Sequence, residues 1–284
     1  MYPRKRSSSS ARNAFRRLED LVVLDMGDGA DGPVLFISDL HLGPDRPDLQ
    51  ALFHAFCAGP GRRARALFIL GDLFDYWIHP AQAREPAYAA PLGDLAALTE
   101  EGVAVYLLVG NRDFPLSPAF LKRYGITLIP DPSSLRLGAK RVLLTHGDLL
   151  CSDDHRYQRF RRIIRHPLTR FLLRPLPYPW LRRLAQGLRR GSQREVARKP
   201  ITITDARPDA IAAALQGADP FAGPLAPYHL IVHGHTHRPQ WEEISSGQHR
   251  LVLGAWEASG AFYGIWDGAV MNLTFFPGAG EPST

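Results

Sequence analysis

The sequence predicts an α/β fold built as a two-sheet sandwich flanked by helices. Short apolar runs alternate with segments of helical character, which is typical of strands that are buried on both faces of a sheet. Apolar residues make up 45% of the 284 residues, enough for a sizeable core. The sequence contains no internal repeats. These observations favour two packed sheets in one layered domain.

The predicted elements follow one another in a regular order. The first strand is expected at Val34–Ile37, and later strands at 66–70, 103–109, 141–144 and 230–232. Helices are expected between them at 49–56, 92–98 and 210–215. Residues 137–140 predict a hairpin turn before the fourth strand. The tail predicts a β meander over 250–253, 261–266 and 270–276, with Asp267-Gly268 as a turn.

The first thirty residues are expected to be a disordered extension, so that the domain covers residues 31–284. Arg4-Lys5-Arg6 is followed by four serines, and this polar, basic stretch cannot form a core. Two alternatives to a disordered extension are an organelle transit peptide and a natural start of synthesis at Met26. No apolar run is long enough for a membrane span or a signal core. Cys57 and Cys151 are expected to be free thiols rather than a disulfide.

Residues 153–205 are expected to form a basic helical insertion in the domain. Between Arg156 and Lys199, fourteen Lys or Arg residues stand against one acid, Glu195. That segment carries +13, and since the whole chain carries +6, the remainder carries −7. The basic character therefore belongs to one local feature.

Three interpretations of this insertion are open. It can lie on an anionic membrane surface and act as a lid with a groove for acyl chains, because apolar side chains recur between its arginines. It can instead be a solvated hairpin whose apolar face packs on the domain. Nucleic-acid binding is the third, since arginines neutralise phosphates well. The apolar stretch 175–180 and the lack of a recognition motif favour the membrane, and no protein partner is inferred.

Five of the predicted strands end in loops that carry potential metal ligands. In chain order the loops contain Asp39-Leu40-His41, Gly71-Asp72, Gly110-Asn111-Arg112-Asp113, His146-Gly147-Asp148 and His233-Gly234-His235-Thr236-His237. The carboxyl ends of strands meet at one edge of a sheet, so these loops can converge. Carboxylate, amide and imidazole ligands suit Mn²⁺, Fe²⁺ or Zn²⁺. Two such ions about 3.5–4 Å apart would lower the pKa of a bridging water and provide a hydroxide nucleophile.

At these residues the sequence resembles the calcineurin-like metallophosphoesterase superfamily. Within it, the stretches FISDLHLG, ILGDLFDYW, GNRDF, LTHGDLLCSDD, HGHTHRP and LVLGAW are similar to the UDP-2,3-diacylglucosamine diphosphatase family of Gram-negative lipid A biosynthesis. The resemblance runs from about Val34 to Phe276.

This resemblance implies a two-Mn²⁺ hydrolase whose hydroxide attacks the nucleotide-side phosphorus of a lipid-linked UDP-sugar. The products would be UMP and 2,3-diacylglucosamine 1-phosphate, formed at the cytoplasmic side of the inner membrane. One alternative is another enzyme of the superfamily, acting on nucleotide phosphodiesters or phosphoproteins. A nucleic-acid or membrane-binding module with a degenerate site is disfavoured, because all five loops keep their ligands.

The resemblance also implies which residues form the site. One metal would be held by Asp39, His41, Asp72 and His237, and the other by Asp72, Asn111, His146 and His235. Catalytic roles would fall to Arg112 and Asp113, and substrate contacts to Asn111, Arg112, Asp154, Ser192, Lys199 and His235. His233 is expected to be a packing residue. The sequence departs from the family pattern at Val196, where a substrate-contacting Asn is usual, at 78–80 and in the N-terminal extension.

Arg112 is informative in itself. Many superfamily members have a His here, which can protonate an alkoxide leaving group, whereas an arginine with a pKa above 12 keeps its proton. A phosphate leaving group needs no proton, because its second pKa is about 6. Arg112 would then supply positive charge to the transition state. The residue type therefore favours a diphosphate substrate.

Overall fold

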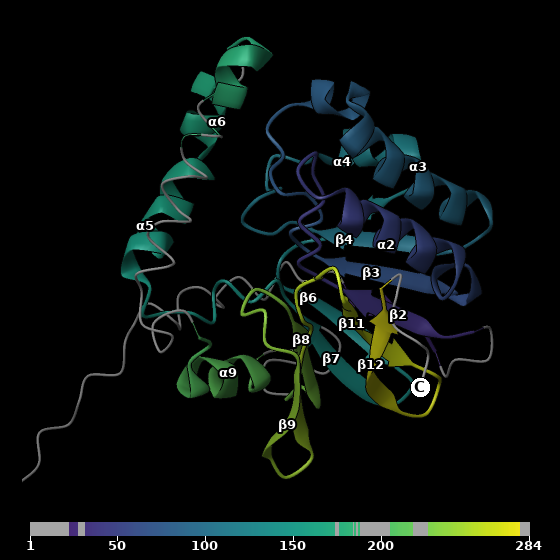
Figure 1. The fold of residues 1–284 in the computed structure, drawn as a ribbon. Coiled ribbons are helices and arrows are strands. Elements are labelled where there is room, and N and C mark those ends of the chain that lie inside the picture. The colour runs from purple at the N-terminus through teal and green to yellow at the C-terminus, as the bar shows by residue number, and fades with distance from the viewer. Residues whose placement is uncertain are drawn as a thin grey trace, which may run out of the picture.

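Two six-stranded β-sheets packed face to face form the centre of the protein in the computed structural model (Figure 1). The structure describes residues 23–27, 32–173, 176–183, 185, 187, 205–217 and 227–278. Sheet A has the order β1 (Val23–Asp25), β6 (Ser133–Leu137), β7 (Lys140–Leu144), β8 (Leu230–His233), β10 (Gln248–Val252) and β9 (Gln240–Ser245). Sheet B has the order β12 (Met271–Pro277), β11 (Gly260–Trp266), β2 (Val34–Ile37), β3 (Ala66–Leu70), β4 (Ala104–Leu108) and β5 (Thr127–Leu128).

Helices cover the outer faces of both sheets, as the predicted α/β sandwich requires. Sheet B is covered by α2 (Pro47–Ala58), α3 (Pro86–Glu100) and α4 (Pro118–Leu121), with short 3₁₀ turns η2 (Gly61–Arg63), η3 (Pro80–Arg84) and η4 (Lys122–Tyr124) between them. On sheet A, α9 (Pro208–Leu215) packs against β8. The first two helices of the insertion, α5 (His155–Ile164) and α6 (Pro167–Leu173), form an arm at one side of the sandwich (Figure 1).

The apolar core has three layers, which explains why the central strands are apolar throughout. Side chains such as Phe36 and Val142 meet between the two sheets. Phe53 belongs to the layer between sheet B and its helices, and Leu215 and Ile231 to the layer under α9. A strand that faces two such layers has no side free for polar residues.

Two sets of parallel strands end at the same edge of the sandwich. In sheet B, β2, β3 and β4 are parallel and in register, with Ile37 opposite Ile69 and Leu70 opposite Leu108. In sheet A, β7 and β8 are parallel. These are the five strands whose following loops carry the predicted ligands, so the expected convergence has its structural basis.

Some predicted elements differ from the structure. The tail is not one meander, because β10 pairs in parallel with β8 in sheet A, whereas β11 and β12 form a hairpin in sheet B. Strands β6 and β9 were not predicted, although the turn expected at 137–140 does join β6 to β7. Neither cysteine forms a disulfide, as expected, and both are buried.

Strand β1 lies inside the stretch that we expected to be disordered. Val23–Asp25 pairs with residues 134–136 of β6, and Leu24 and Met26 pack against the core between the sheets. The end of the extension is therefore part of sheet A, and a chain that began at Met26 would lack this strand. Residues 1–22 lie outside the described residues.

Deletion of residues 1–22 should leave the melting temperature unchanged, whereas deletion of residues 1–26 should lower it by a few degrees. The longer deletion removes β1, exposes the edge of β6 and takes Leu24 and Met26 out of the core. Losing one or two half-buried apolar side chains costs about 1–3 kcal/mol. Thermal unfolding of both variants checks this, and equal melting temperatures would show that β1 adds nothing to the fold.

Candidate metal centre

Five loops from both sheets meet at one edge of the sandwich and carry the predicted ligands. Backbone hydrogen bonds hold the loops together. The Asp39 N–H donates to the Gly71 carbonyl at 3.1 Å, and the His41 N–H donates to the Asp72 carbonyl at 3.0 Å. Across the sheets, the His235 N–H donates to Asp39 Oδ2 at 2.8 Å. The ligand loops are thus fixed relative to one another by the main chain.

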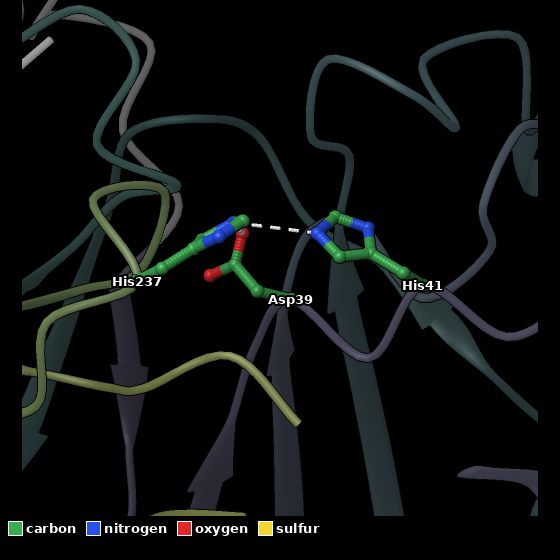
Figure 2. Close-up of side chains that lie close together, drawn as sticks. All are labelled: Asp39, His41 and His237. Carbon is green, nitrogen blue, oxygen red and sulfur yellow. Dashed lines mark hydrogen bonds and ion pairs between the residues drawn. The ribbon is translucent and has the colours of Figure 1, made fainter. Parts of the chain in front are cut away.

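One group of ligands consists of Asp39, His41 and His237 (Figure 2). The two Nε2 atoms of His41 and His237 lie 3.3 Å apart, and His237 Nε2 lies 3.3 Å from Asp39 Oδ1. Asp39 Oδ1 and His41 Nδ1 are buried and have no hydrogen-bond partner among the described residues. Buried polar atoms normally have partners, and a cation among these three side chains would provide one. The donor set therefore fits a divalent metal.

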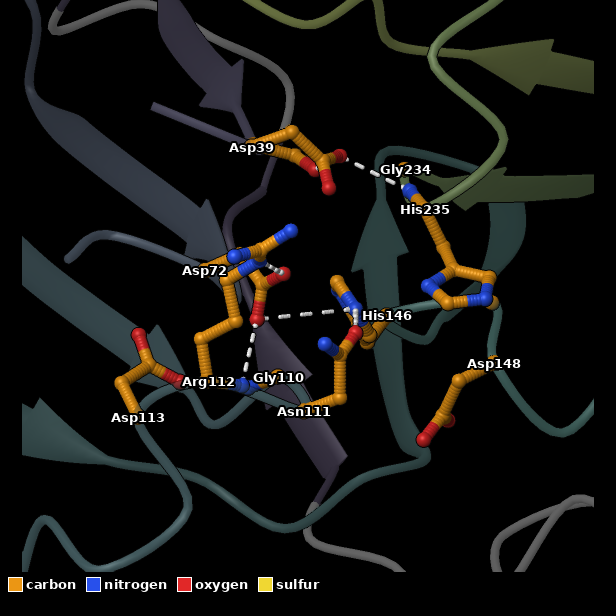
Figure 3. A network of polar contacts seen from close by, with 12 residues as sticks. Asp39, Asp72, Gly110, Asn111, Arg112, Asp113, His146, Asp148, Gly234 and His235 are labelled. Carbon is orange, nitrogen blue, oxygen red and sulfur yellow. Dashed lines mark hydrogen bonds and ion pairs between the residues drawn. The ribbon is translucent and has the colours of Figure 1, made fainter. Parts of the chain in front are cut away.

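A second group contains Asp39, Asp72 and His146, with Asn111 beside it (Figure 3). His146 Nδ1 lies 2.9 Å from the Leu70 carbonyl, so this nitrogen donates its proton there and Nε2 faces the site. His146 Nε2 is 3.0 Å from Asn111 Oδ1 and 3.8 Å from Asp72 Oδ1. The His235 ring lies next to that of His146, with the two ring centroids 5.0 Å apart.

Asp72 lies between the two groups. Its carboxylate is almost fully buried, 3.9 Å from His41 Nδ1 on one side and 3.8 Å from His146 Nε2 on the other. This position fits the shared ligand that the resemblance implies. Asp39 is the other carboxylate within reach of both groups.

The neighbouring charges place the imidazoles in different protonation states. Burial lowers the pKa of His146, but the carboxylates of Asp72, Asp39 and Asp148 outweigh it and raise that pKa to about 9. Burial and the charge of His146 lower the pKa of His235 to about 4. Because a metal binds the neutral imidazole, we expect metal binding near pH 7 to release a proton from His146 and not from His235.

Five predicted ligands share an unusual backbone conformation. Positive φ angles of 51–69° occur at Asp39, His41, Asp72, His235 and His237, the only non-glycine residues with positive φ in the part of the chain that the structure describes. Such residues cost of order 1 kcal/mol each and persist where the surrounding structure imposes them.

Close packing of the loops explains why a glycine stands at position 71, beside the ligand Asp72. Gly71 has φ of 89°, and a Cβ atom there would lie only 2.7 Å from His146 Nδ1. Glycine is therefore needed at this position to let the second and fourth loops approach each other.

Arg112 lies at the open side of the site, whereas Asp113 lies behind it. Arg112 Nε is 3.4 Å from Asp72 Oδ2, and the side chain is 29% exposed, so the guanidinium can contact both Asp72 and a substrate. Asp113 is fully buried and accepts hydrogen bonds from the Gly110 and Leu73 N–H groups at 2.7 and 2.8 Å. This geometry suits a residue that orders two ligand loops better than the catalytic residue expected from the sequence.

The expected substrate contacts are only partly described. Asp154 caps the N-terminus of α5 by accepting a hydrogen bond from the Tyr157 N–H at 3.1 Å. Ser192, Val196 and Lys199 lie outside the described residues. His233 is fully buried, accepts a hydrogen bond from Arg250 Nε at 2.9 Å and donates to the Gly234 carbonyl at 2.8 Å. Both of its ring nitrogens are engaged, as expected for a packing residue.

Sequence reasoning named Asp148 in the fourth loop but missed the polar contacts behind His146. Asp131 and Asp148 are carboxylates beside this loop, and three side chains approach them: Tyr157 and Arg161 of α5, and Arg165 at its C-cap. The spacing of four residues between these three is the signal that was available, because it places them on one face of a helix.

Comparison with known proteins agrees with this geometry. The family model for the calcineurin-like phosphoesterases matches residues 32–239, more than half of the chain and all five ligand loops. The chain belongs to the calcineurin-like phosphoesterase family. Calcineurin-like phosphoesterases use a dinuclear divalent metal site, and the two ligand groups described above are candidates for it.

Curated relatives extend the similarity over nearly their whole length. The chain is 42% identical to the UDP-2,3-diacylglucosamine hydrolase of Pseudomonas savastanoi pv. phaseolicola, over 80% of this chain and 89% of that protein. It is 40% identical to the protein of the same name from Edwardsiella ictaluri, over 80% and 86%. Among solved structures, a dimetal phosphatase from Danio rerio is 14% identical, with a TM-score of 0.44 over 86% of this chain and 96% of that one.

Proposed function

We propose that this calcineurin-like phosphoesterase hydrolyses the diphosphate of UDP-2,3-diacylglucosamine to UMP and 2,3-diacylglucosamine 1-phosphate. The relatives that carry this substrate in their name share at least 40% identity with the chain over most of both lengths. The observation that carries the proposal within this chain is the position of Arg112. Its partly exposed guanidinium lies beside the shared carboxylate Asp72, at the side from which a diphosphate would reach the metals.

The metals and the residues of the site would have different roles in this reaction. When bound, two divalent ions would activate water for attack on phosphorus and polarise the phosphoryl oxygens. We propose Mn²⁺, which suits the mixture of carboxylate, amide and imidazole ligands. Arg112 would bind the phosphate oxygens and stabilise the charge that develops during the reaction. Asp113 would keep the Asp72 and Asn111 loops in position through its two backbone hydrogen bonds.

The direct test is release of UMP from UDP-2,3-diacylglucosamine by the purified protein. We expect turnover with Mn²⁺ and none after chelation. A protein that holds two metals and hydrolyses simple phosphodiesters, but leaves this substrate intact, would instead be another kind of calcineurin-like phosphoesterase.

The insertion arm supports a proposal about location. None of the helices that the structure describes combines the length and apolar character needed to span a bilayer. However, of the nine large apolar side chains that are exposed in the described part of the chain, six lie on the insertion: Phe160, Ile163, Leu168, Phe171, Leu172 and Trp180. A cluster of exposed apolar side chains on a basic helical segment is typical of membrane-surface contact. We propose that the arm contacts the anionic cytoplasmic face of the inner membrane and helps to capture the lipid substrate.

Replacing Phe171 and Leu172 with Gln should raise KM for the lipid substrate about tenfold or more and weaken liposome binding. These side chains are 70% and 61% exposed, so the fold does not depend on them, and burial in lipid is worth about 1.5–3 kcal/mol for each. Turnover of a small soluble phosphodiester should not change. Val270→Gln, which alters a side chain 51% exposed on the β11–β12 turn, is the matched control. An equal loss of both activities would show that the arm is structural.

A further inference from the structure

One face of α5 is polar and points toward the body of the protein. Tyr157, Arg161 and the C-cap residue Arg165, whose backbone is still helical, follow one another at intervals of four residues and therefore share this face. The side chains of Arg161 and Arg165 are only 16% and 21% exposed. On the other face, Phe160 and Ile163 are 44% and 54% exposed. This part of the arm is thus amphipathic, with Arg161 and Arg165 directed inward.

Two of these side chains bind Asp148, a fully buried carboxylate two residues after His146. Tyr157 Oη donates to Asp148 Oδ2 at 2.7 Å, and Arg161 Nε donates to the same oxygen at 2.6 Å. Asp148 cannot ionise favourably in a buried place without such donors. The His146 loop is therefore held from its C-terminal side by α5.

Arg161 also approaches the carboxylate on the other side of His146. Its terminal nitrogen lies 3.8 Å from Asp131 Oδ2. Asp131 Oδ1 in turn accepts a hydrogen bond from the His146 N–H at 3.2 Å and one from the Thr145 hydroxyl at 2.7 Å. One arginine thus lies between two buried carboxylates that flank the ligand His146.

The third side chain reaches a different ligand loop. Arg165 donates to the Gly110 carbonyl at 2.6 Å, and Gly110 immediately precedes Asn111. The Tyr157 ring lies 5.9 Å from that of His235, measured between centroids. The face therefore contacts the loops or rings of Asn111, His146 and His235, the ligands of one metal.

We infer that Tyr157, Arg161 and Arg165 are positioning residues for that metal, called here the second metal, and that the insertion thereby sets its affinity. None of the contacts named above reaches His41 or His237, the ligands that belong to the first group alone. The inference rests on the dinuclear site of the proposed function. Residues that orient metal ligands from behind typically change metal affinity 10–100-fold when they are replaced.

Metal titration of Arg165→Met and Tyr157→Phe tests this inference without reference to turnover. Starting from metal-free protein, we expect the dissociation constant of the second metal to rise 10–100-fold, and that of the first to stay within about threefold. With Mn²⁺, electron paramagnetic resonance should show a spin-coupled pair in the wild type and a single uncoupled ion in the variants at limiting metal. Arg159→Met alters an exposed arginine of the same helix and should bind both metals normally.

Combination with ligand variants shows which metal is affected. Added to His146→Ala, Arg165→Met should cause no further loss of metal, whereas added to His41→Ala it should remove most of what remains. Melting temperatures of the metal-free variants within a few degrees of wild type would show that folding is intact. Two metals bound with wild-type affinity in Arg165→Met and Tyr157→Phe, or an equal weakening of both metals, would overturn the inference. A wild-type chain that never binds two metals would instead overturn the dinuclear site itself.

Discussion

Replacement of Asp72 with Ala should lower kcat about a thousandfold or more. Asp72 lies between His41 and His146 at 3.9 and 3.8 Å, so its carboxylate is placed to bind both metals at once. Without it, both ions lose a ligand and the charge that holds them together, and water is no longer activated. Steady-state kinetics with metal analysis on the same preparations measures both effects.

A surface carboxylate provides the control for this prediction. Asp94 pairs with His54 at 2.8 Å on the helical layer, and His54 is 71% exposed. Asp94→Ala should leave kcat and metal content unchanged, because an ion pair of this kind contributes less than about 1 kcal/mol. Two metals and near-normal turnover in Asp72→Ala would rule out the site as described.

Replacement of Arg112 with Ala should lower kcat by roughly 10²–10⁴, the range found when one donor to transition-state charge is removed. The guanidinium is 29% exposed and 3.4 Å from Asp72 Oδ2, so it is available to phosphate oxygens near the metals. Arg112→Lys should recover only part of the rate, because an ammonium cannot reproduce the two parallel hydrogen bonds of a guanidinium. Metal content should stay at two per chain in both variants.

A control variant and an isotope experiment test this role of Arg112 further. Arg62 forms a surface ion pair with Glu101 at 2.7 Å, and Arg62→Ala should have no kinetic effect. In water labelled with ¹⁸O, the label should appear in UMP, since attack falls on the nucleotide-side phosphorus. Label in the lipid phosphate would place the attack on the other phosphorus. Turnover of Arg112→Ala within a few-fold of normal would remove the argument that Arg112 marks a diphosphate substrate.

The elements that the sequence predicted well are those buried on both faces. Val34–Ile37 and Ala66–Leu70 coincide with β2 and β3, because a strand between two apolar layers is an uninterrupted apolar run. Strand β9 was missed because its residues alternate between exposed and half-buried at the edge of sheet A, where pairing with β10 decides the conformation. Whether β10 joins one sheet or the other depends on such long-range pairing, and no local pattern encodes it.

For the candidate metal centre, residue type and position after buried strands were enough to predict which side chains come together, but not the residues that support them. Asp and His after buried strands indicate metal chemistry directly. The left-handed backbone at Asp39 or His237 arises from contacts between loops and has no signal in the chain. Arg161 and Arg165 were counted as surface charge. A sequence shows the charge of a side chain but not which face of its helix packs against the rest of the protein.

The division of the ligands between the two sheets has a consequence for how the protein is made. Each proposed metal would draw on loops of sheet B, from the first half of the chain, and on loops of sheet A, whose last candidate ligands are His235 and His237. A ribosome produces the N-terminal half first, so a partly synthesised chain holds Asp39 and Asp72 long before these histidines exist. Neither ion can acquire its full shell until synthesis has passed residue 237. With these ligands, we expect each molecule to load its metals only after both histidines have been synthesised.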